Sequence, residues 1–203
     1  MDLFRGMLVA SSNAGKLKEI REILKDYIHV NIFSLTDLGA EPVEVEETGN
    51  TFEENALIKA KFYAEKLGYV TLADDSGLEV DYLKGEPGVK SARYAGVGAK
   101  DSDLCNKILK KLEGVPLDKR TARFKCVICL YDPVDMSYLF YEGTCEGTIA
   151  IKASGKNGFG YDPVFIPNDF APKTIAELSS SIKNSISHRG RALSLLKEKL
   201  LYC

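Results

Sequence analysis

Two adjacent carboxylates, Asp74 and Asp75, are the residues of this 203-residue chain best suited to chemistry, and Ser76 and Gly77 follow them. The apolar run 69–73 before them predicts a strand, so the pair would stand at its C-terminal end, before a turn. Hard cations such as Mg²⁺ prefer carboxylate oxygens as ligands. Since side chains alternate along a strand, only one of the two normally faces a site. The alternative is a common Asp-Ser-Gly turn, and the spacing does not decide between them.

Further oxygen ligands for a cation are available elsewhere in the chain. Four glutamates could complete a cluster, although their spacing does not show that they lie together: Glu46, Glu47, Glu53 and Glu54. With only two histidines, His29 and His188, the chain has too few imidazoles for a histidine-rich metal site. A metal in this protein would therefore be a hard cation held by carboxylates.

A short polar segment is the candidate phosphate site, and it consists of Ser11, Ser12, Asn13, Ala14, Gly15 and Lys16. It follows the strand-like run Met7–Ala10 and precedes an amphipathic helical pattern. The N-terminus of a helix receives anions, and Lys16 adds a positive charge. The segment lacks the spacing of a Walker A loop. A capped helix with a surface lysine would have the same sequence, so this segment alone is weak.

A candidate base-binding segment places Phe159 between Gly158 and Gly160, with Asp162 just ahead of Pro163. Flanking glycines would expose the ring face, on which a nucleobase can stack. The carboxylate could accept a hydrogen bond from a base N–H. The alternative is a β-turn whose aromatic residues fill the core.

Four basic or near-basic side chains gather near the start of the last predicted helix: Lys183, His188, Arg189 and Arg191. The whole chain balances 27 Lys and Arg against 29 Asp and Glu, for a net charge of −2. This balance gives no support to a general nucleic-acid binder or a membrane-surface binder. The local cluster suits a small anionic molecule instead.

The composition places the chain among soluble globular proteins, with 45% hydrophobic and 28% charged residues. We find no apolar run of 18 residues and no signal-peptide core, so we expect the cytoplasm. Five cysteines form no even disulfide framework. Cys126 and Cys129 do form a C-x-x-C, but on a predicted strand, where the two thiols face opposite sides of the sheet. We interpret them as buried core residues.

The elements expected around these residues indicate a mixed α/β fold with parallel and antiparallel strands. Strands are expected at Met7–Ala10, His29–Leu35, Tyr69–Ala73, Leu78–Leu83, 121–131, 138–145 and Thr148–Lys152. Helices are expected after Asn13, from Thr51 to about Leu67, and at Asp101–Leu112, Thr174–Leu178 and Ser187–Leu200. A long glycine-rich loop, Gly85–Gly98, is expected to be functional.

At these residues the chain resembles the HAM1/inosine triphosphate pyrophosphatase family. The matching segments, in the order of the family, are Ser11–Lys16, Glu46–Gly49 with Thr51-Phe52 and Glu54–Ala56, Ala73–Gly77, Gly88 with Ser91–Tyr94, Gly158–Pro163, and Ser187–Gly190. Together they span nearly the whole chain, and six ordered motifs make the resemblance specific. The one departure is Ser11, where many members carry threonine, and it keeps the hydroxyl.

The resemblance implies an α/β fold with a long central mixed sheet flanked by helices. It also implies two lobes with an active-site cleft between them, so that residues 1–203 form a single two-lobed nucleotide pyrophosphatase domain. The implied activity is Mg²⁺-dependent hydrolysis of ITP, dITP and XTP to the monophosphate and pyrophosphate, which cleanses the nucleotide pool. A homodimer is implied as the usual assembly.

The roles of single residues carry over in the same way. Glu46 and Asp75 would be the metal residues, and Asp75 would also be the base acting on the attacking water. Ser11–Lys16, Ser76 and Lys59 would hold the triphosphate. The residues implied for the base are Phe159, Gly160, Tyr161, Asp162, Lys183, His188 and Arg189, with Phe159 stacking on the purine.

Two alternatives stay open at this point. One is a Maf-like nucleotide pyrophosphatase that prefers another base. The other is a nucleotide-binding sensor without turnover, against which the intact Asp74-Asp75 pair and Lys16 argue. A nucleic-acid-binding module is the least favoured interpretation, because the basic residues cluster at one place rather than along a face.

Overall fold

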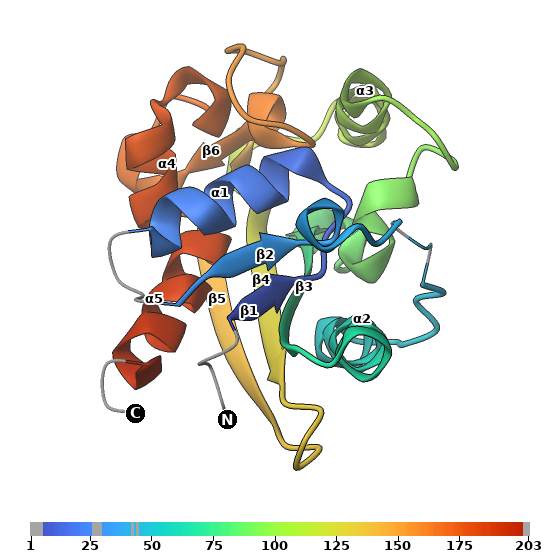
Figure 1. Ribbon diagram of the computed structural model, residues 1–203. Helices are drawn as coiled ribbons and strands as arrows, with labels where there is room; N and C mark the ends of the chain where they lie inside the picture. The colour runs from blue at the N-terminus through green and yellow to red at the C-terminus, as the bar shows by residue number, and fades with distance from the viewer. Residues whose placement is uncertain (1–5, 26–29, 42, 44, 201–203) are drawn as a thin grey trace. The chain divides into compact units, whose positions relative to one another are not determined.

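The computed structural model describes residues 6–25, 30–41, 43 and 45–200 (Figure 1). Within these ranges, six strands form one mixed sheet in the order β2-β1-β3-β4-β5-β6. The strands are β1 (Met7–Val9), β2 (Ile32–Ser34), β3 (Val70–Val80), β4 (Thr121–Tyr131), β5 (Tyr138–Ile149) and β6 (Phe165–Pro167). Strand β1 pairs in parallel with β2 and β3, whereas β5 and β6 are antiparallel. The mixed sheet predicted from the sequence is confirmed.

Five α-helices accompany the sheet in the described part of the chain: α1 (Ala14–Leu24), α2 (Phe52–Leu67), α3 (Asp101–Lys111), α4 (Ser180–Ile186) and α5 (His188–Leu200). Local sequence determines where two of these helices, α1 and α2, begin. The Asn13 side chain accepts from the Lys16 N–H at 3.0 Å, and Thr51 Oγ1 accepts from the Glu54 N–H at 3.2 Å. Helix α2 ends at Gly68, whose φ of 72° is left-handed. These boundaries match the predictions.

The chain divides into two compact units, and three long strands pass from one unit into the other. The first unit comprises residues up to 75, 126–143 and from 191 onwards, and the second comprises 76–125 and 144–190. The core of the first unit includes Met7, Ile20, Leu24, Leu72, Ile128 and Leu193. The core of the second includes Leu78, Ile108, Phe124, Ile149, Val164 and Phe165. That the whole chain is one two-lobed domain with a cleft stays a prediction.

The turn expected at Asp74–Gly77 is wrong, because β3 continues through these residues to Val80. Polar residues normally interrupt a buried strand, since an unpaired buried carboxylate is costly. Here both carboxylates are buried and have partners close by, so the strand needs no break. Leu78 and Val80, expected to begin a separate strand, are the buried end of the same one.

Other boundaries differ in smaller ways. The separate strand expected at Thr148–Lys152 is wrong, because β5 runs without a break to Ile149. Helix α4 was not expected from the sequence. The glycine-rich loop 85–98 contains a 3₁₀ segment, Gly88–Arg93, in which Ser91 Oγ donates to the Gly88 carbonyl at 2.6 Å. Part of the strand predicted at 29–35 lies outside the described residues, since His29 is not described.

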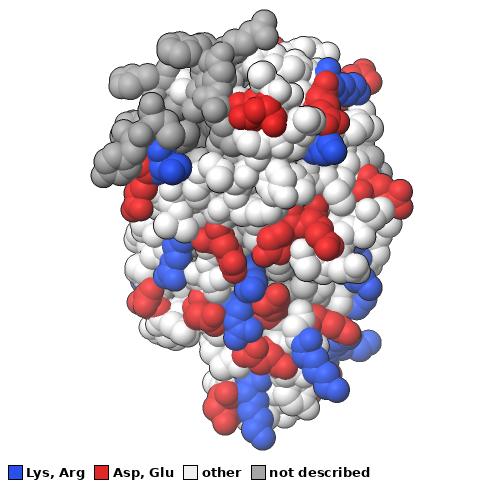
Figure 2. All heavy atoms as spheres, turned by 90° about the horizontal axis from the view of Figure 1, so that it is seen from below, with Lys and Arg blue, Asp and Glu red and all other residues white. Residues whose placement is uncertain are grey.

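The cysteine prediction holds where the structure tests it. Cys126 and Cys129 both lie on β4 and are fully buried, and Cys126 belongs to the core of the first unit. In the described ranges, we find no helix long and apolar enough to cross a membrane. On the face drawn in Figure 2, acidic and basic side chains are interspersed, and neither sign covers a continuous area.

Candidate active site

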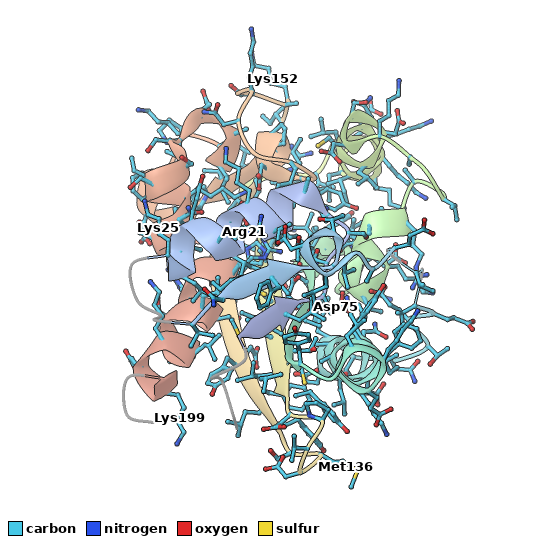
Figure 3. The ribbon with its side chains drawn as sticks, viewed as in Figure 1. Arg21, Lys25, Asp75, Met136, Lys152 and Lys199 are labelled. Carbon is cyan, nitrogen blue, oxygen red and sulfur yellow. The ribbon has the colours of Figure 1, made fainter. Side chains whose placement is uncertain are left out.

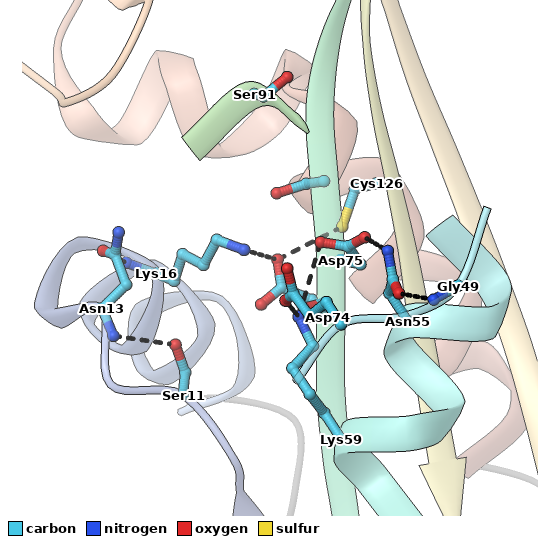
Figure 4. A network of polar contacts seen from close by, with 12 residues as sticks. Ser11, Asn13, Lys16, Gly49, Asn55, Lys59, Asp74, Asp75, Ser91 and Cys126 are labelled. Carbon is cyan, nitrogen blue, oxygen red and sulfur yellow. Dashed lines mark hydrogen bonds and ion pairs between the residues drawn. The ribbon is translucent and has the colours of Figure 1, made fainter. Parts of the chain in front are cut away.

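Asp75 occupies the centre of a polar network in the first unit (Figures 3 and 4). Asp75 is 5% exposed, and helix α2 supplies two partners for its carboxylate. Asn55 Nδ2 donates to Oδ2 at 3.1 Å, and Lys59 Nζ lies 3.5 Å from Oδ1. Burial raises the pKa of Asp75 above its usual range, while the charges of Lys59 and Lys16 act in the opposite direction.

Lys59 places its ammonium among oxygens from three residues. Its Nζ lies 2.8 Å from Glu47 Oε1 and 2.8 Å from the Asp74 carbonyl oxygen, in addition to the Asp75 contact. Burial acts to lower the pKa of Lys59, but the nearby carboxylates outweigh burial and raise it. The side chain therefore stays charged, and the oxygens around it form a site that already holds a cation.

The predicted phosphate segment meets the acidic pair through Lys16. Lys16 Nζ lies 3.1 Å from Asp74 Oδ2, and the Asp74 side chain is almost completely buried. Ser11 Oγ accepts from the Asn13 N–H at 3.2 Å, which shapes the turn into α1. Ser12, Asn13 and Ala14 are exposed, and Gly15 is partly buried. The segment therefore offers the accessible start of a helix beside a lysine, as a phosphate site requires.

The glutamates predicted as further ligands have different positions. Glu47 is half-buried and bound to Lys59, whereas its neighbour Glu46 is exposed. Glu54 accepts from the Asn50 N–H at 2.6 Å and so helps to begin α2. The assignment of Glu46 as a metal residue stays a prediction.

Sequence reasoning missed Asn55 as a member of this network, and it named Glu47 only as one of four candidate ligands. A signal for Asn55 was present, because it precedes Lys59 by four residues on α2 and so lies on the same helix face. No local signal separates Glu47 from Glu46, since the choice depends on the path of an irregular segment.

The residues around Asp75 fit a hard divalent cation that arrives with phosphates. Within the residues described, no group of three or more His, Cys, Asp or Glu side chains forms a metal site by itself. Mg²⁺ does not need one, because it keeps several waters and is usually bound through one or two carboxylates plus phosphate oxygens. Asp75 and Glu47 provide carboxylate oxygens around a position that a cationic group occupies. The donor chemistry therefore suits Mg²⁺.

A second group of predicted residues gathers around Phe159 in the second unit. Lys183 Nζ lies over the Phe159 ring, 4.4 Å from its centroid, and the Arg189 guanidinium carbon lies 5.8 Å from the same point. Both distances fall in the range of cation–π attraction. The ring is half-buried, so it is oriented by two cations and remains accessible in part.

Asp162 fixes the loop that carries this ring. Its Oδ2 accepts from the Phe159 N–H at 2.9 Å and forms an ion pair with Lys183 Nζ. Gly158 has a φ of 77°, and a Cβ there would lie 2.0 Å from Asp162 Oδ2. The glycine is thus required by the approach of the carboxylate. That Asp162 also accepts from a base N–H stays a prediction.

Gly160 and Tyr161 attach the same loop to its surroundings. The Gly160 N–H donates to Asp101 Oδ2 at 2.7 Å, and its carbonyl accepts from Cys105 Sγ at 3.3 Å. The Tyr161 side chain is buried and donates to the Ser91 carbonyl at 2.8 Å. Tyr161 therefore acts in the core through its side chain, and its predicted contact with a substrate would have to come from its backbone.

Arg189 is the largest fully buried side chain of the described residues. Its Nη2 donates to Ser76 Oγ at 3.0 Å, and Ser76 directly follows Asp75 in the chain. The preceding residue, His188, stacks on Phe124 with ring centroids 4.7 Å apart and planes 14° apart. At Gly190, a Cβ would lie 1.9 Å from the Asn184 carbonyl oxygen, which explains a glycine where α5 begins.

Comparisons with known proteins identify the family of this chain. The model of the Ham1 family matches residues 7–199. A dITP/XTP pyrophosphatase of Bacillus cereus is 46% identical, over 98% of this chain and 97% of its own. One from Thermoanaerobacter pseudethanolicus is 49% identical, over 96% of each chain.

Two solved structures match over nearly their whole length. A HAM1 protein from Coxiella burnetii has a TM-score of 0.86 and 42% identity, covering 98% of this chain and 99% of its own. The Ham1 protein of Staphylococcus aureus has a TM-score of 0.83 and 43% identity, covering 96% and 97%. The chain described here belongs to the Ham1 family.

Proposed function

We propose that this protein hydrolyses non-canonical purine nucleoside triphosphates, namely dITP, ITP and XTP, to the monophosphate and pyrophosphate, and so cleanses the nucleotide pool. The observation that carries the proposal is the buried Asp75, held by Asn55 and Lys59 beside a lysine-bearing helix start. It stands in a chain that matches proteins named dITP/XTP pyrophosphatase over nearly its full length.

The proposed cofactor is Mg²⁺. Ham1-family nucleotide pyrophosphatases generally depend on a divalent metal ion. In this chain Asp75 would hold it, together with Glu46 as the resemblance implies or the neighbouring Glu47. When bound, Mg²⁺ neutralises phosphate charge and polarises the bond between the α- and β-phosphates.

Asp75 is the proposed base for the attacking water. Its carboxylate accepts a proton from the water as the oxygen attacks phosphorus, and pyrophosphate leaves. Burial favours proton uptake, because it raises the pKa of this carboxyl. Lys16, Lys59 and the N–H groups at the start of α1 bind the phosphate oxygens, so that negative charge is neutralised before and during the reaction.

The residues around Phe159 are proposed to select the base. A purine stacked on this ring comes within reach of Arg189 and Lys183, whose cationic groups lie over the same ring. Hypoxanthine and xanthine present a 6-keto acceptor to such donors, whereas adenine presents a 6-amino donor. A mismatch that leaves a buried polar group unpaired costs about 1–3 kcal/mol, which disfavours ATP.

The deciding experiment incubates the protein and Mg²⁺ with ITP, dITP, XTP, ATP, GTP and UTP separately and identifies the released anion. We expect pyrophosphate from the first three substrates and little from ATP. Loss of activity in excess chelator and recovery with Mg²⁺ would support the cofactor. Faster cleavage of UTP would favour a Maf-like enzyme, and tight nucleotide binding without turnover would favour a sensor; either result overturns the proposal.

We also propose that the protein works in the cytoplasm as a homodimer. Support for the dimer comes from family resemblance and from apolar side chains exposed along the hairpin between β4 and β5, whose tip carries Met136 (Figure 3). Met136 is 67% exposed, and Tyr138 and Phe140 are 48% and 40% exposed. Clustered apolar exposure of this kind marks interaction surfaces. Size-exclusion chromatography with light scattering gives the mass of the assembly, and a monomer overturns this part.

A further inference from the structure

Helix α2 presents three polar side chains, Asn55, Lys59 and Tyr63, at intervals of four residues, which places them on one face. All three bind the irregular segment that precedes the helix. Tyr63 Oη accepts from the Val43 N–H at 2.9 Å and donates to the Val43 carbonyl at 2.8 Å. Lys59 binds Glu47 one helical turn earlier. The segment thus runs back along the helix and is tied to it at successive turns.

Asn55 makes the third attachment, and both ends of its side-chain amide form hydrogen bonds. Oδ1 accepts from the Gly49 N–H at 2.9 Å, while Nδ2 donates to Asp75 Oδ2 at 3.1 Å. Asn55 is buried, with 1% of the residue exposed. A Cβ on Gly49 would lie 2.6 Å from Asn55 Oδ1, so only glycine allows this close approach.

The two bonds orient the amide without ambiguity. A backbone N–H can only donate, so the end that faces Gly49 must be the carbonyl oxygen. The NH₂ group is then directed at Asp75. Because the amide is neutral, it restrains Asp75 Oδ2 without adding a charge, and Oδ1 remains beside the Lys59 ammonium.

We propose that Asn55 is a positioning residue of the active site: its amide, fixed by Gly49, holds the Asp75 carboxylate in the orientation in which it acts on water. This inference rests on the proposed function. Asn55 acts through Asp75 and has no direct role toward the substrate. Its loss should therefore reduce turnover and leave nucleotide binding largely intact.

The test is Asn55→Leu, which keeps the approximate size of the side chain and adds no charge. It removes the donor toward Asp75 and the acceptor for the Gly49 N–H. We expect kcat for ITP to fall about 10- to 100-fold, as is typical when a supporting partner is removed. The KM for ITP should stay within about threefold, because binding the unreacted substrate does not need this bond. The Kd of an ITP analogue with an imido group between the α- and β-phosphorus should be equally insensitive.

The matched control is Tyr63→Phe on the same helix face. It removes both bonds to Val43 but touches nothing at Asp75. We expect it to lower the unfolding temperature while kcat stays near that of the natural protein. Asn55→Ala is the second test variant, in case Asn55→Leu does not fold. Circular dichroism and thermal unfolding establish the folded fraction of each variant.

The outcomes separate this inference from the proposed function. If the natural protein does not release pyrophosphate from ITP, the proposed function fails. If it does, and folded Asn55 variants keep their kcat, only the positioning role is wrong. The role is also wrong if KM and Kd rise as much as kcat falls, or if Tyr63→Phe loses kcat to the same extent.

Discussion

The two groups of site residues are built on different physics. Around Asp75, in the first unit, opposite charges face one another at short range, as in the pairs Lys16–Asp74 and Lys59–Glu47. Around Phe159, in the second unit, one ion pair anchors the loop, and the main feature is an aromatic ring under two cations. The first group is an electrostatic network, and the second is a stacking surface with hydrogen-bond donors.

This difference assigns different kinetic consequences to the two groups. Fixed charges in a buried network matter most where charge develops during the reaction, so they act on kcat. A ring that stacks on the base binds substrate and transition state about equally, so it acts on KM. Donors beside the ring act on the choice between bases. Substitutions in each group can therefore break or sharpen the comparison.

The largest effect is expected from Asp75→Asn. The amide keeps the size of the side chain but cannot take a proton from water, and loss of a general base costs about 10²- to 10⁴-fold in rate. We expect kcat for ITP to fall by this amount, with a smaller change in KM, measured by pyrophosphate release. A kcat within about tenfold of the natural protein would mean that another group is the base.

A smaller effect, on selectivity, is expected from Arg189→Lys. The charge is kept, but the planar fork that reaches Ser76 Oγ and lies over Phe159 is lost. We expect the ratio of kcat/KM for ITP over ATP to fall about 5- to 100-fold, the equivalent of one buried hydrogen bond. The ratio follows from parallel assays with both nucleotides. An unchanged ratio would place base selection elsewhere.

Next comes Phe159→Ala, which removes the ring and keeps the loop backbone that Asp162 anchors. Stacking of a base on an aromatic side chain contributes about 1–3 kcal/mol, so KM for ITP should rise about 5- to 100-fold. The kcat should change much less, in contrast to Asp75→Asn. If kcat falls while KM stays constant, the residues around Phe159 act on the rate of the reaction and not on substrate binding.

The sequence was sufficient wherever local interactions decide the structure. The starts of α1 and α2 and the end of α2 depend on Asn13, Thr51 and Gly68, each of which acts within a few residues. The types of residue at the site were also predictable, because carboxylates, lysines and a glycine-flanked ring have recognisable chemistry. The family resemblance added the order of the motifs and the roles of single residues.

What the sequence could not show depends on partners distant in the chain. A turn was predicted at Asp74 and Asp75, because no residue near them in the sequence offers a partner for two buried carboxylates. Lys16 and Asn55, about 60 and 20 residues earlier, provide that compensation and allow β3 to continue. Whether Glu46 or Glu47 faces Lys59 likewise depends on how the segment before α2 is hydrogen-bonded to that helix. Local patterns contain no such information.

The smallest effect on activity is expected from substitution of two buried thiols, Cys126 and Cys105, which contact these two groups. Cys126 Sγ lies 3.9 Å from Asp74 Oδ2, and Cys105 Sγ donates to the Gly160 carbonyl. Burial, followed by the charges of Asp101 and Asp162, raises the pKa of Cys105 to about 12. A raised thiol pKa means that the folded protein favours the neutral form until the pH exceeds that value. At mildly alkaline pH the thiolate, which is the reactive form, is therefore scarce.

We expect iodoacetamide to label Cys105 only after denaturation, as measured by mass spectrometry of its peptide. The variants Cys105→Ala and Cys126→Ala should retain kcat and KM for ITP within about threefold, since small buried thiols act mainly through packing. Rapid labelling of Cys105 in the native protein would show that the loop containing Phe159 and Gly160 opens. In that case the residues around Phe159 would be mobile, whereas the network around Asp75 is fixed. The two groups would then differ in dynamics as well as in chemistry.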